Sequence, residues 1–131
     1  RSFADYVATV DDSFLKIMQC EHVEAVKNLD AILDVPGVDA IICGPMDLSA
    51  SVGKMGQYFD PEVIALMQTI IDKCKAHHKP FGLSIGVDMK LIQFWLERGA
   101  SFLSMGTPQD YFRTMSQDVI QQVRAIEAQQ S

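Results

Sequence analysis

The sequence has few cysteines, and their arrangement excludes a disulfide-stapled fold. Cys20, Cys43 and Cys74 are three in number, and no two of them form a Cys-x-x-Cys pair. Small extracellular domains rely on even sets of cysteines for their disulfide frameworks, whereas a few free thiols are typical of a reducing compartment. We therefore expect a cytoplasmic protein in which the cysteines are small core residues.

Positive charge and long apolar runs are also scarce. The 131 residues carry 11 Lys and Arg against 17 Asp and Glu, a formal net charge of −6. The basic residues form no cluster that would suit a nucleic-acid backbone. No apolar run approaches the roughly 20 residues of a membrane-spanning helix, and no signal peptide opens the chain. We expect neither a nucleic acid nor a membrane among the partners.

Glycine-rich phosphate-binding motifs are missing as well. The chain contains 8 Gly, but no G-x-G-x-x-G fingerprint and no Walker motif, which argues against the nucleotide-binding doubly wound folds. The composition, 48% hydrophobic and 21% charged, is that of an ordinary globular domain. Because the first residue is arginine rather than methionine, we expect the chain to begin inside a longer protein.

What the sequence does contain is a repeated pattern of strand followed by helix. Short apolar runs predict strands, and apolar residues at helical spacing predict the helices between them. Caps support three of the helix starts: Asp60 before Pro61, Asp88, and Thr107 with Asp110. The predicted strands are Phe14–Gln19, Ala40–Cys43, Phe81–Ile85 and Ser101–Met105. The predicted helices cover residues 2–13, 23–33, 61–79, 88–98 and 108–131.

This order of elements predicts the fold class. Strict alternation of strand and helix indicates a parallel sheet with right-handed crossovers. Four such units are half of an eight-stranded barrel, which typically needs ~250 residues. A four-stranded half would leave open edges and an uncovered strand face, which is a liability in water. The pattern alone therefore allows either a small open sheet or half of a barrel whose other half lies elsewhere.

Polar residues follow the predicted strands at the ends where parallel α/β folds place their active sites. These positions are Gln19 and Glu21, Gly44–Asp47, Ser84–Val87, and Met105–Thr107. Adjacent parallel strands lie ~4.8 Å apart, so carboxylates following two neighbouring strands could approach one cation. Two carboxylates with open positions suit Mg²⁺ or Mn²⁺. Alternatively, Glu21 is a first-turn acid of the next helix and Asp47 or Ser49 is a helix cap. The residue pattern leaves both interpretations open.

The histidines and the last helix start have simpler interpretations. His22 is expected to be an exposed residue at a helix start, and His77 and His78 to interact with the dipole of the helix that they end. Thr107 is expected to cap the last helix. No Ser-His-Asp or Cys-His arrangement can be derived from the spacing.

Several stretches resemble one enzyme family. Gln19-Cys20-Glu21, residues 24–39 and Gly44-Pro45-Met46-Asp47-Leu48-Ser49 are similar to the HpcH/HpaI family of metal-dependent class II pyruvate aldolases. That family includes 4-hydroxy-2-oxoheptanedioate and 2-keto-3-deoxy-sugar-acid aldolases. The likeness continues through residues 60–63, 79–82 and 99–106, and so covers most of the chain. It implies an α/β fold, the C-terminal half of a (β/α)₈ TIM barrel, with four parallel β/α units preceded by one helix.

The same resemblance implies roles for individual residues. Glu21 and Asp47 would be the two protein ligands of a divalent metal, Mg²⁺ or Mn²⁺, with Co²⁺ as an alternative. The substrate-binding residues would be Gln19, Gly44, Pro45, Met46, Asp47 and Ser84. Backbone N–H groups of Met46 and Asp47 would hold the carboxylate of pyruvate, and Ser84 would lie near the pocket for an aldehyde. The metal would stabilise the pyruvate enolate that carbon–carbon bond cleavage forms.

Two features of the family bear on what this chain can do alone. Its His–Asp acid/base pair and its arginine lie in the first half of the barrel, which these residues do not include, so we expect the chain alone to be inactive. Related aldolases are hexamers that exchange their last helix, here residues 108–131, so a homo-oligomer is expected.

Two other functions remain open. One is a non-catalytic half-barrel that serves assembly or metal binding. The other is an acyl-CoA lyase of the citrate or malyl-CoA type, which the lack of a basic cluster for the CoA phosphate disfavours.

Overall fold

The four strands form one parallel sheet whose spatial order is the order of the chain. In the computed structural model, which describes residues 2–129, the strands pair as β1–β2–β3–β4. Ile17 of β1 lies opposite Ala40 of β2, Ile41 of β2 opposite Phe81 of β3, and Gly82 of β3 opposite Phe102 of β4. The strands are β1 (Ile17–Gln19), β2 (Ala40–Cys43), β3 (Phe81–Ile85) and β4 (Phe102–Met105). The α/β class and the parallel sheet predicted from the sequence are confirmed.

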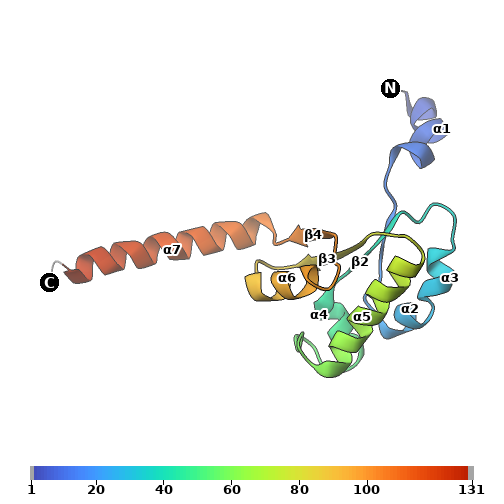
Figure 1. Cartoon of the computed structure of the whole chain (residues 1–131). Coiled ribbons are helices and arrows are strands. Elements are labelled where there is room, and N and C mark those ends of the chain that lie inside the picture. The colour runs from blue at the N-terminus through green and yellow to red at the C-terminus, as the bar shows by residue number, and fades with distance from the viewer. Residues whose placement is uncertain (1, 130–131) are drawn as a thin grey trace.

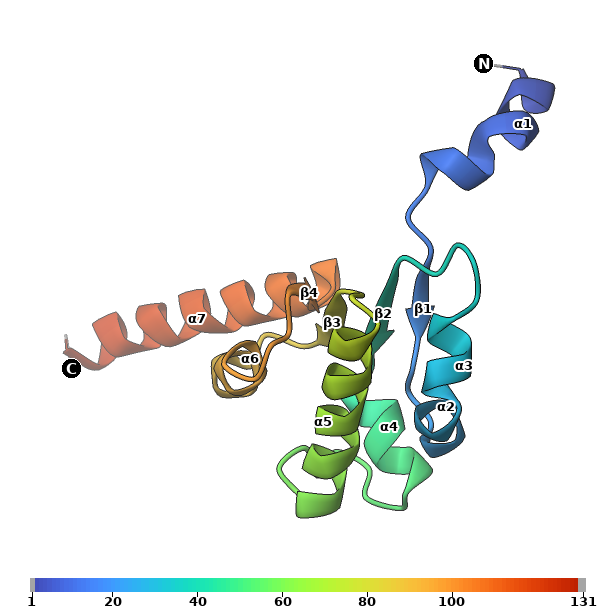
Figure 2. The ribbon, with the colours of Figure 1, turned by 45° about the vertical axis from the view of Figure 1, so that its right-hand side comes forward.

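Helices connect the strands and flank the sheet. The helices are α1 (Phe3–Ser13), α2 (Val23–Lys27), α3 (Leu29–Leu33), α4 (Pro45–Ser51), α5 (Pro61–Ala76), α6 (Met89–Leu96) and α7 (Pro108–Gln129). Helices α2 to α6 lie together on one side of the sheet (Figures 1 and 2). No helix within residues 2–129 is both long enough and apolar enough to cross a membrane.

The core lies between the sheet and these helices. Ile41 and Leu83 point toward the helices and are fully buried. The residues that alternate with them point to the opposite face, where Gln19 and Ser84 are exposed. This face carries no helix, so apolar side chains there, such as that of Ile17, stay partly open to solvent. The uncovered strand face anticipated from the sequence is therefore present.

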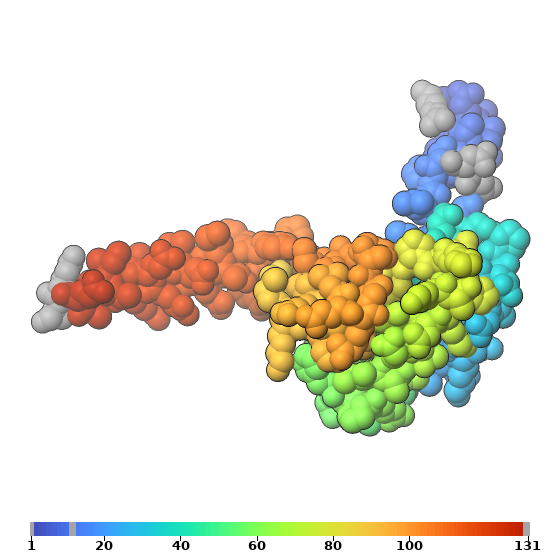
Figure 3. All heavy atoms as spheres, viewed as in Figure 1, coloured from blue at the N-terminus to red at the C-terminus, as the bar shows by residue number. Residues whose placement is uncertain are grey.

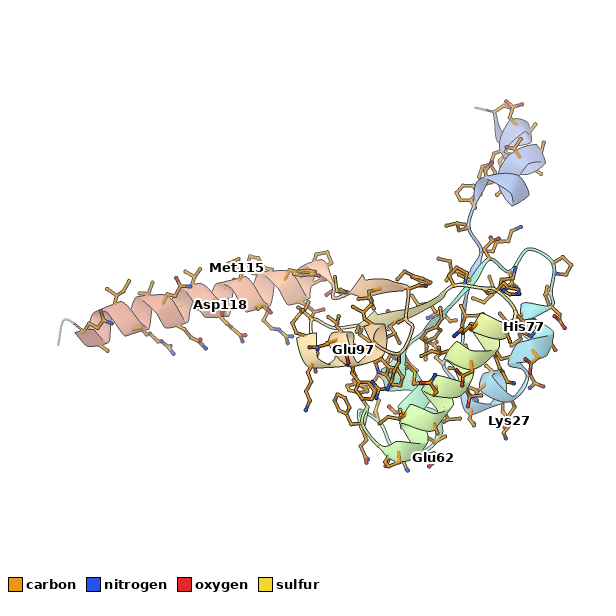
Figure 4. The ribbon with its side chains drawn as sticks, in the orientation of Figure 1. Lys27, Glu62, His77, Glu97, Met115 and Asp118 are labelled. Atoms are coloured by element: carbon orange, nitrogen blue, oxygen red, sulfur yellow. The ribbon has the colours of Figure 1, made fainter. Side chains whose placement is uncertain are left out.

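Helices α1 and α7 stand clear of the body of the molecule (Figure 3). None of the residues of α7 is buried. Its apolar side chains that remain exposed are Tyr111, Phe112, Met115, Val119, Ile120, Val123 and Ile126. Met115 and Asp118 are labelled on this projecting helix in Figure 4. Residues 130 and 131, which the sequence assigned to the same helix, lie outside the described residues.

Two sequence predictions of local structure were wrong in their extent. The helix expected over residues 23–33 is split at Asn28 (φ −90°, ψ 9°), whose side-chain amide donates to the Glu24 carbonyl. The side chain of Lys73, on α5, donates to the Val26 carbonyl at 3.1 Å. A neighbouring helix thus supplies a hydrogen-bond donor to a carbonyl near the end of α2. The first strand begins at Ile17 instead of Phe14: the ladder with β2 starts at Ile17 and Ala40, and the Lys16 amide donates to the side-chain carboxylate of Asp39 at 2.7 Å instead of to a backbone carbonyl.

Candidate active site

The carboxyl end of β2 leads directly into α4. Gly44 is the N-cap of this helix in extended geometry, Pro45 follows at the first helical position, and Asp47 lies in the first turn. No side chain caps α4. Neither Asp47 nor Ser49 is therefore the cap that the simpler interpretation required. Pro45 suits its position because it lacks only an N–H group that has no partner inside the helix.

Glu21 and Asp47 converge on Gly44. A β-carbon added to Gly44 would lie 2.9 Å from Glu21 Oε2 and 3.2 Å from Asp47 Oδ2, so the two carboxylate oxygens flank the same empty space beside the backbone. The φ of Gly44 is −92°, which other residues also adopt. This space stays open because Gly44 has no side chain. The backbone conformation of Gly44 is ordinary and is not the cause.

Gln19 orients one of these carboxylates. Its side-chain Nε2 donates to Glu21 Oε2 at 3.1 Å, the oxygen that faces Gly44. Gln19 and Glu21 lie on the same side of the chain because alternate residues of an extended strand share a face. The structure thus brings together Gln19, Glu21, Gly44 and Asp47, as the sequence predicted.

Two buried sulfur-containing side chains, those of Cys43 and Met67, pack in the core next to this site. Cys43 is fully buried, and its thiol lies 3.4 Å from the sulfur of Met67. Burial raises the pKa of the Cys43 thiol well above its ordinary value, and nearby Cys20, Glu21 and Asp47 raise it further. Burial likewise raises the pKa of Cys20 to about 11. Cys20, Cys43 and Cys74 all belong to the buried hydrophobic core, as expected of small packing residues.

A cavity of about 500 Å³ lies next to this group, at the ends of β3 and β4. Its wall includes three of the predicted substrate-binding residues: Pro45, Met46 and Ser84. Gln19, Glu21, Gly44 and Asp47 do not line it. The other lining residues are Tyr58, Ile85, Gly86, Val87, Asp88, Leu91, Ser104, Gly106, Thr107 and Asp110. The carboxylate pair and the cavity are thus adjacent parts of one edge of the sheet, joined at Pro45 and Met46.

Sequence reasoning did not place Ser104 or Tyr58 in this cavity wall. Ser104 lies opposite Ser84 in the β3–β4 register, so both side chains point to the uncovered face of the sheet. Each serine is the second-last residue of its strand, and this shared position could have indicated that Ser104 lies beside Ser84. Tyr58 contacts Met46, with 3.6 Å between its hydroxyl and the Met46 sulfur. Tyr58 comes from the irregular segment after α4, and no sequence pattern places it there.

The histidines and the start of α7 have structural roles. His22 caps α2, since its Nδ1 accepts from the Glu24 amide at 3.2 Å. His77 lies 3.2 Å from carboxylate oxygens of Asp30 and Asp34, at the end of α5 beside α3 (Figure 4). The expected capping box of α7 is confirmed: the Thr107 amide donates to the Asp110 carboxylate, and the Asp110 amide donates to the Thr107 hydroxyl.

The donor set at Gly44 fits a hard divalent cation. Two carboxylates face one open space, and Mg²⁺ or Mn²⁺ is commonly held by one or two carboxylates with water and substrate oxygens in the remaining positions. Residues 2–129 contain no group of three or more His, Cys, Asp or Glu side chains arranged to hold a metal. Any metal at this edge would therefore depend on ligands beyond Glu21 and Asp47.

A sequence model described as HpcH/HpaI aldolase/citrate lyase matches residues 7–115 of the chain. The chain belongs to this family. The 5-keto-4-deoxy-D-glucarate aldolase of Citrobacter koseri is 37% identical over 113 residues, which are 86% of this chain and 44% of that protein. The chain thus spans less than half the length of this relative. The resemblance recognised in the sequence is confirmed.

Two solved structures of the same family share the fold. The HpcH/HpaI aldolase from Desulfitobacterium hafniense superposes with a TM-score of 0.79 at 29% identity, over 95% of this chain and 48% of that one. A family protein from Burkholderia cenocepacia gives a TM-score of 0.83 at 26% identity, over 92% of this chain and 46% of that one.

Proposed function

We propose that this chain supplies the metal-binding and carboxylate-binding half of an aldolase, a carbon–carbon lyase acting on 2-oxo acids. The observation that carries the proposal is the convergence of Glu21 and Asp47 on Gly44 at the carboxyl edge of a parallel sheet. Active sites of (β/α)₈ enzymes lie at this edge. Membership of a family that contains aldolases supports the same reaction class.

We further propose that the sheet is the C-terminal half of a (β/α)₈ barrel and that residues 1–131 form a partial domain. The uncovered face of the sheet supports this, because its alternate residues are those that would point into a closed barrel. Phe102 lies across Gly82 on that face, at a contact that leaves no room for a β-carbon. The shares of 44–48% covered in the relatives agree with half a barrel.

Glu21 and Asp47 would hold a divalent metal, Mg²⁺ or Mn²⁺, and Gln19 would fix the Glu21 carboxylate by its hydrogen bond. A bound divalent ion acts as a Lewis acid that polarises the ketone oxygen of a 2-oxo acid. Gly44 keeps the approach to both carboxylates open.

The start of α4 would bind the substrate carboxylate. The N–H groups of Met46 and Asp47 belong to the first turn of α4, which no side chain caps. Free amides at a helix start, aided by the helix dipole, attract anions. A substrate such as pyruvate would therefore have its carboxylate at Met46 and Asp47 and an aldehyde partner in the adjoining cavity, beside Ser84.

None of the histidines among the described residues lines the cavity at this edge. His22 is a helix cap, and His77 pairs with Asp30 and Asp34 at the opposite end of α5. We propose that the proton-transfer residues lie in the other half of the barrel. We therefore propose that catalysis needs that half. We also propose that the protein is a homo-oligomer assembled through α7 and that it works in the cytoplasm.

A second candidate follows from the same observation. A half-barrel without the family's acid/base pair could serve assembly or metal binding alone. The two functions differ in what happens when the barrel is completed, because only an aldolase half would restore turnover.

The first test measures metal binding by this chain. Titration with Mn²⁺, followed by electron paramagnetic resonance of the free ion, should show one site that Glu21→Gln or Asp47→Asn weakens by more than the ~10–100-fold typical of outer residues of a metal site. Glu97→Gln, on an exposed carboxylate near the end of α6 (Figure 4), serves as the control. Equal affinity in all four proteins would exclude the site.

The second test measures catalysis. The N-terminal half of the Citrobacter koseri relative would be co-expressed with this chain, and pyruvate would be supplied with glycolaldehyde or succinic semialdehyde. Aldol product that disappears with EDTA, with Glu21→Gln or with Asp47→Asn supports the aldolase. Assembly of the two halves without product, in the presence of Mn²⁺, favours the non-catalytic function.

A further inference from the structure

The segment that carries Glu21 is held at both ends by the strand-and-helix unit that carries Asp47. At one end, the Cys20 amide donates to the Ile42 carbonyl of β2 at 2.9 Å. At the other end, the Val23 amide donates to the hydroxyl of Ser51, the last residue of α4, at 3.1 Å. Glu21 lies between these two anchors.

The Ser51 hydroxyl makes two hydrogen bonds, one as acceptor and one as donor. It accepts from Val23 and donates to the Leu48 carbonyl at 2.7 Å, one turn earlier in α4. Its direction is therefore fixed by the helix that also holds Asp47 in its first turn. Because Val23 is the first residue of α2, its amide has no acceptor within that helix, and the hydroxyl from α4 fills this role.

We propose that Ser51 is a positioning residue that sets the separation of the Glu21 and Asp47 carboxylates. This inference rests on the proposed function of the two carboxylates as metal ligands. Ser51 touches neither the cation space nor the substrate cavity. It acts by joining the segment after Glu21 to the helix of Asp47, so that both carboxylates stay directed at Gly44.

Ser49 offers a close comparison within the same helix. Its hydroxyl donates to the Met46 carbonyl at 2.8 Å and accepts from the Gly56 amide at 3.0 Å. Like Ser51, Ser49 donates to the carbonyl of the residue three positions earlier and accepts from an amide outside the helix. The distant amide, however, belongs to the segment that follows α4 and has no connection to Glu21. Loss of the Ser49 hydroxyl should destabilise the fold without releasing the Glu21 segment.

The first arm of the test needs no metal. Amide hydrogen exchange would be compared in wild type, Ser51→Ala, Ser51→Thr and Ser49→Ala. Ser51→Ala should speed exchange at Val23 by ~10-fold or more relative to the change at Gly56, and Ser49→Ala should show the reverse. Exchange at Val23 that is unchanged in Ser51→Ala would overturn the proposed connection.

The second arm measures Mn²⁺ affinity in the same four proteins, together with their unfolding temperatures. Ser51→Ala should weaken Mn²⁺ binding by ~10-fold, the low end for residues that orient metal ligands, and Ser51→Thr should restore it. If the two alanine variants lose affinity only in proportion to their loss of unfolding temperature, Ser51 is merely structural and the proposal fails. Wild type that binds no Mn²⁺ would instead refute the metal site itself, while the exchange arm would still report on the connection.

Discussion

The carboxylates of Glu21 and Asp47 meet beside Gly44, although the two residues are 26 positions apart in the sequence. Each follows the end of a different strand, and those strands are neighbours in the sheet. The space between these two carboxylates depends on the missing side chain at Gly44 and on the residues that orient Glu21.

Gly44→Ala should impair metal binding with little effect on the backbone. The φ of Gly44 is accessible to alanine, but the new β-carbon would lie 2.9 Å from Glu21 Oε2 and 3.2 Å from Asp47 Oδ2 and would push both carboxylates away. We expect Mn²⁺ affinity to fall by ~10-fold or more, measured by calorimetry. Gly86→Ala is the matched control, since a β-carbon there meets nothing within 4 Å. Equal affinities in the two variants would contradict the geometry.

Gln19→Ala should weaken metal binding without lowering stability. The Gln19 side chain is exposed, so its removal costs little packing, but the Glu21 carboxylate loses the hydrogen bond that orients it. We expect a ~10-fold loss of Mn²⁺ affinity and an unfolding temperature within about 1 °C of wild type. Gln93→Ala removes a similar exposed bond, to Glu97, and should change neither quantity. A drop in both quantities for Gln19→Ala would point to a structural role.

The buried thiols predict a loss of stability at alkaline pH. Burial raises the pKa of Cys20 from 9.0 to about 11, so the thiol stays protonated in the folded chain while the unfolded chain ionises it. This contribution is fully present below pH 9 and is lost as the pH rises toward 11. Urea unfolding between pH 8 and 10.5 should show the decline, and Cys20→Ala should make it shallower. An unchanged pH dependence in Cys20→Ala would exclude Cys20 as its source.

The projecting helix α7 predicts self-association. Exposed apolar residues such as Phe112 and Met115 cover one stripe of a helix with no buried residue, and patches of this kind mark contact surfaces. Light scattering should give a mass above that of one chain, and Met115→Asp should lower it. Asp118→Asn, at another position on α7, serves as the control. A wild-type monomer would contradict both this assignment and the half-barrel.

Ser84 predicts the chemistry of the acceptor. Ser84 and Ser104 place two hydroxyls on the uncovered face of neighbouring strands, and both line the cavity beside Met46. Ser84→Ala removes the hydroxyl with only a small change in the size of the side chain. In the completed barrel it should favour an aliphatic aldehyde such as propionaldehyde over glycolaldehyde by ~10-fold in kcat/KM. An unchanged ratio would exclude Ser84 from acceptor recognition.

The sequence alone predicted the four strands in order, with the first strand three residues too long, and most helix starts, and it indicated Glu21 and Asp47 as candidate metal ligands. These signals are local: apolar runs and periodicity, the proline after Asp60, and an acid placed just beyond a strand. Predictions from these signals succeed because each signal depends on a few neighbouring residues. Burial in the folded chain then favours the same helix or strand that the local sequence prefers.

Only the tertiary structure decided features that depend on a distant partner. Lys73 from α5 donates to the Val26 carbonyl beside the break at Asn28, and the Asp39 carboxylate accepts from the Lys16 amide just before β1 begins. The pattern left open whether Asp47 was a cap or faced a shared space; its position in the first turn of α4 and the approach of Glu21 resolved this. The hydrogen bond from Val23 to Ser51 spans 28 residues. No periodicity encodes such a contact, because it exists only once the sheet has brought the two segments together.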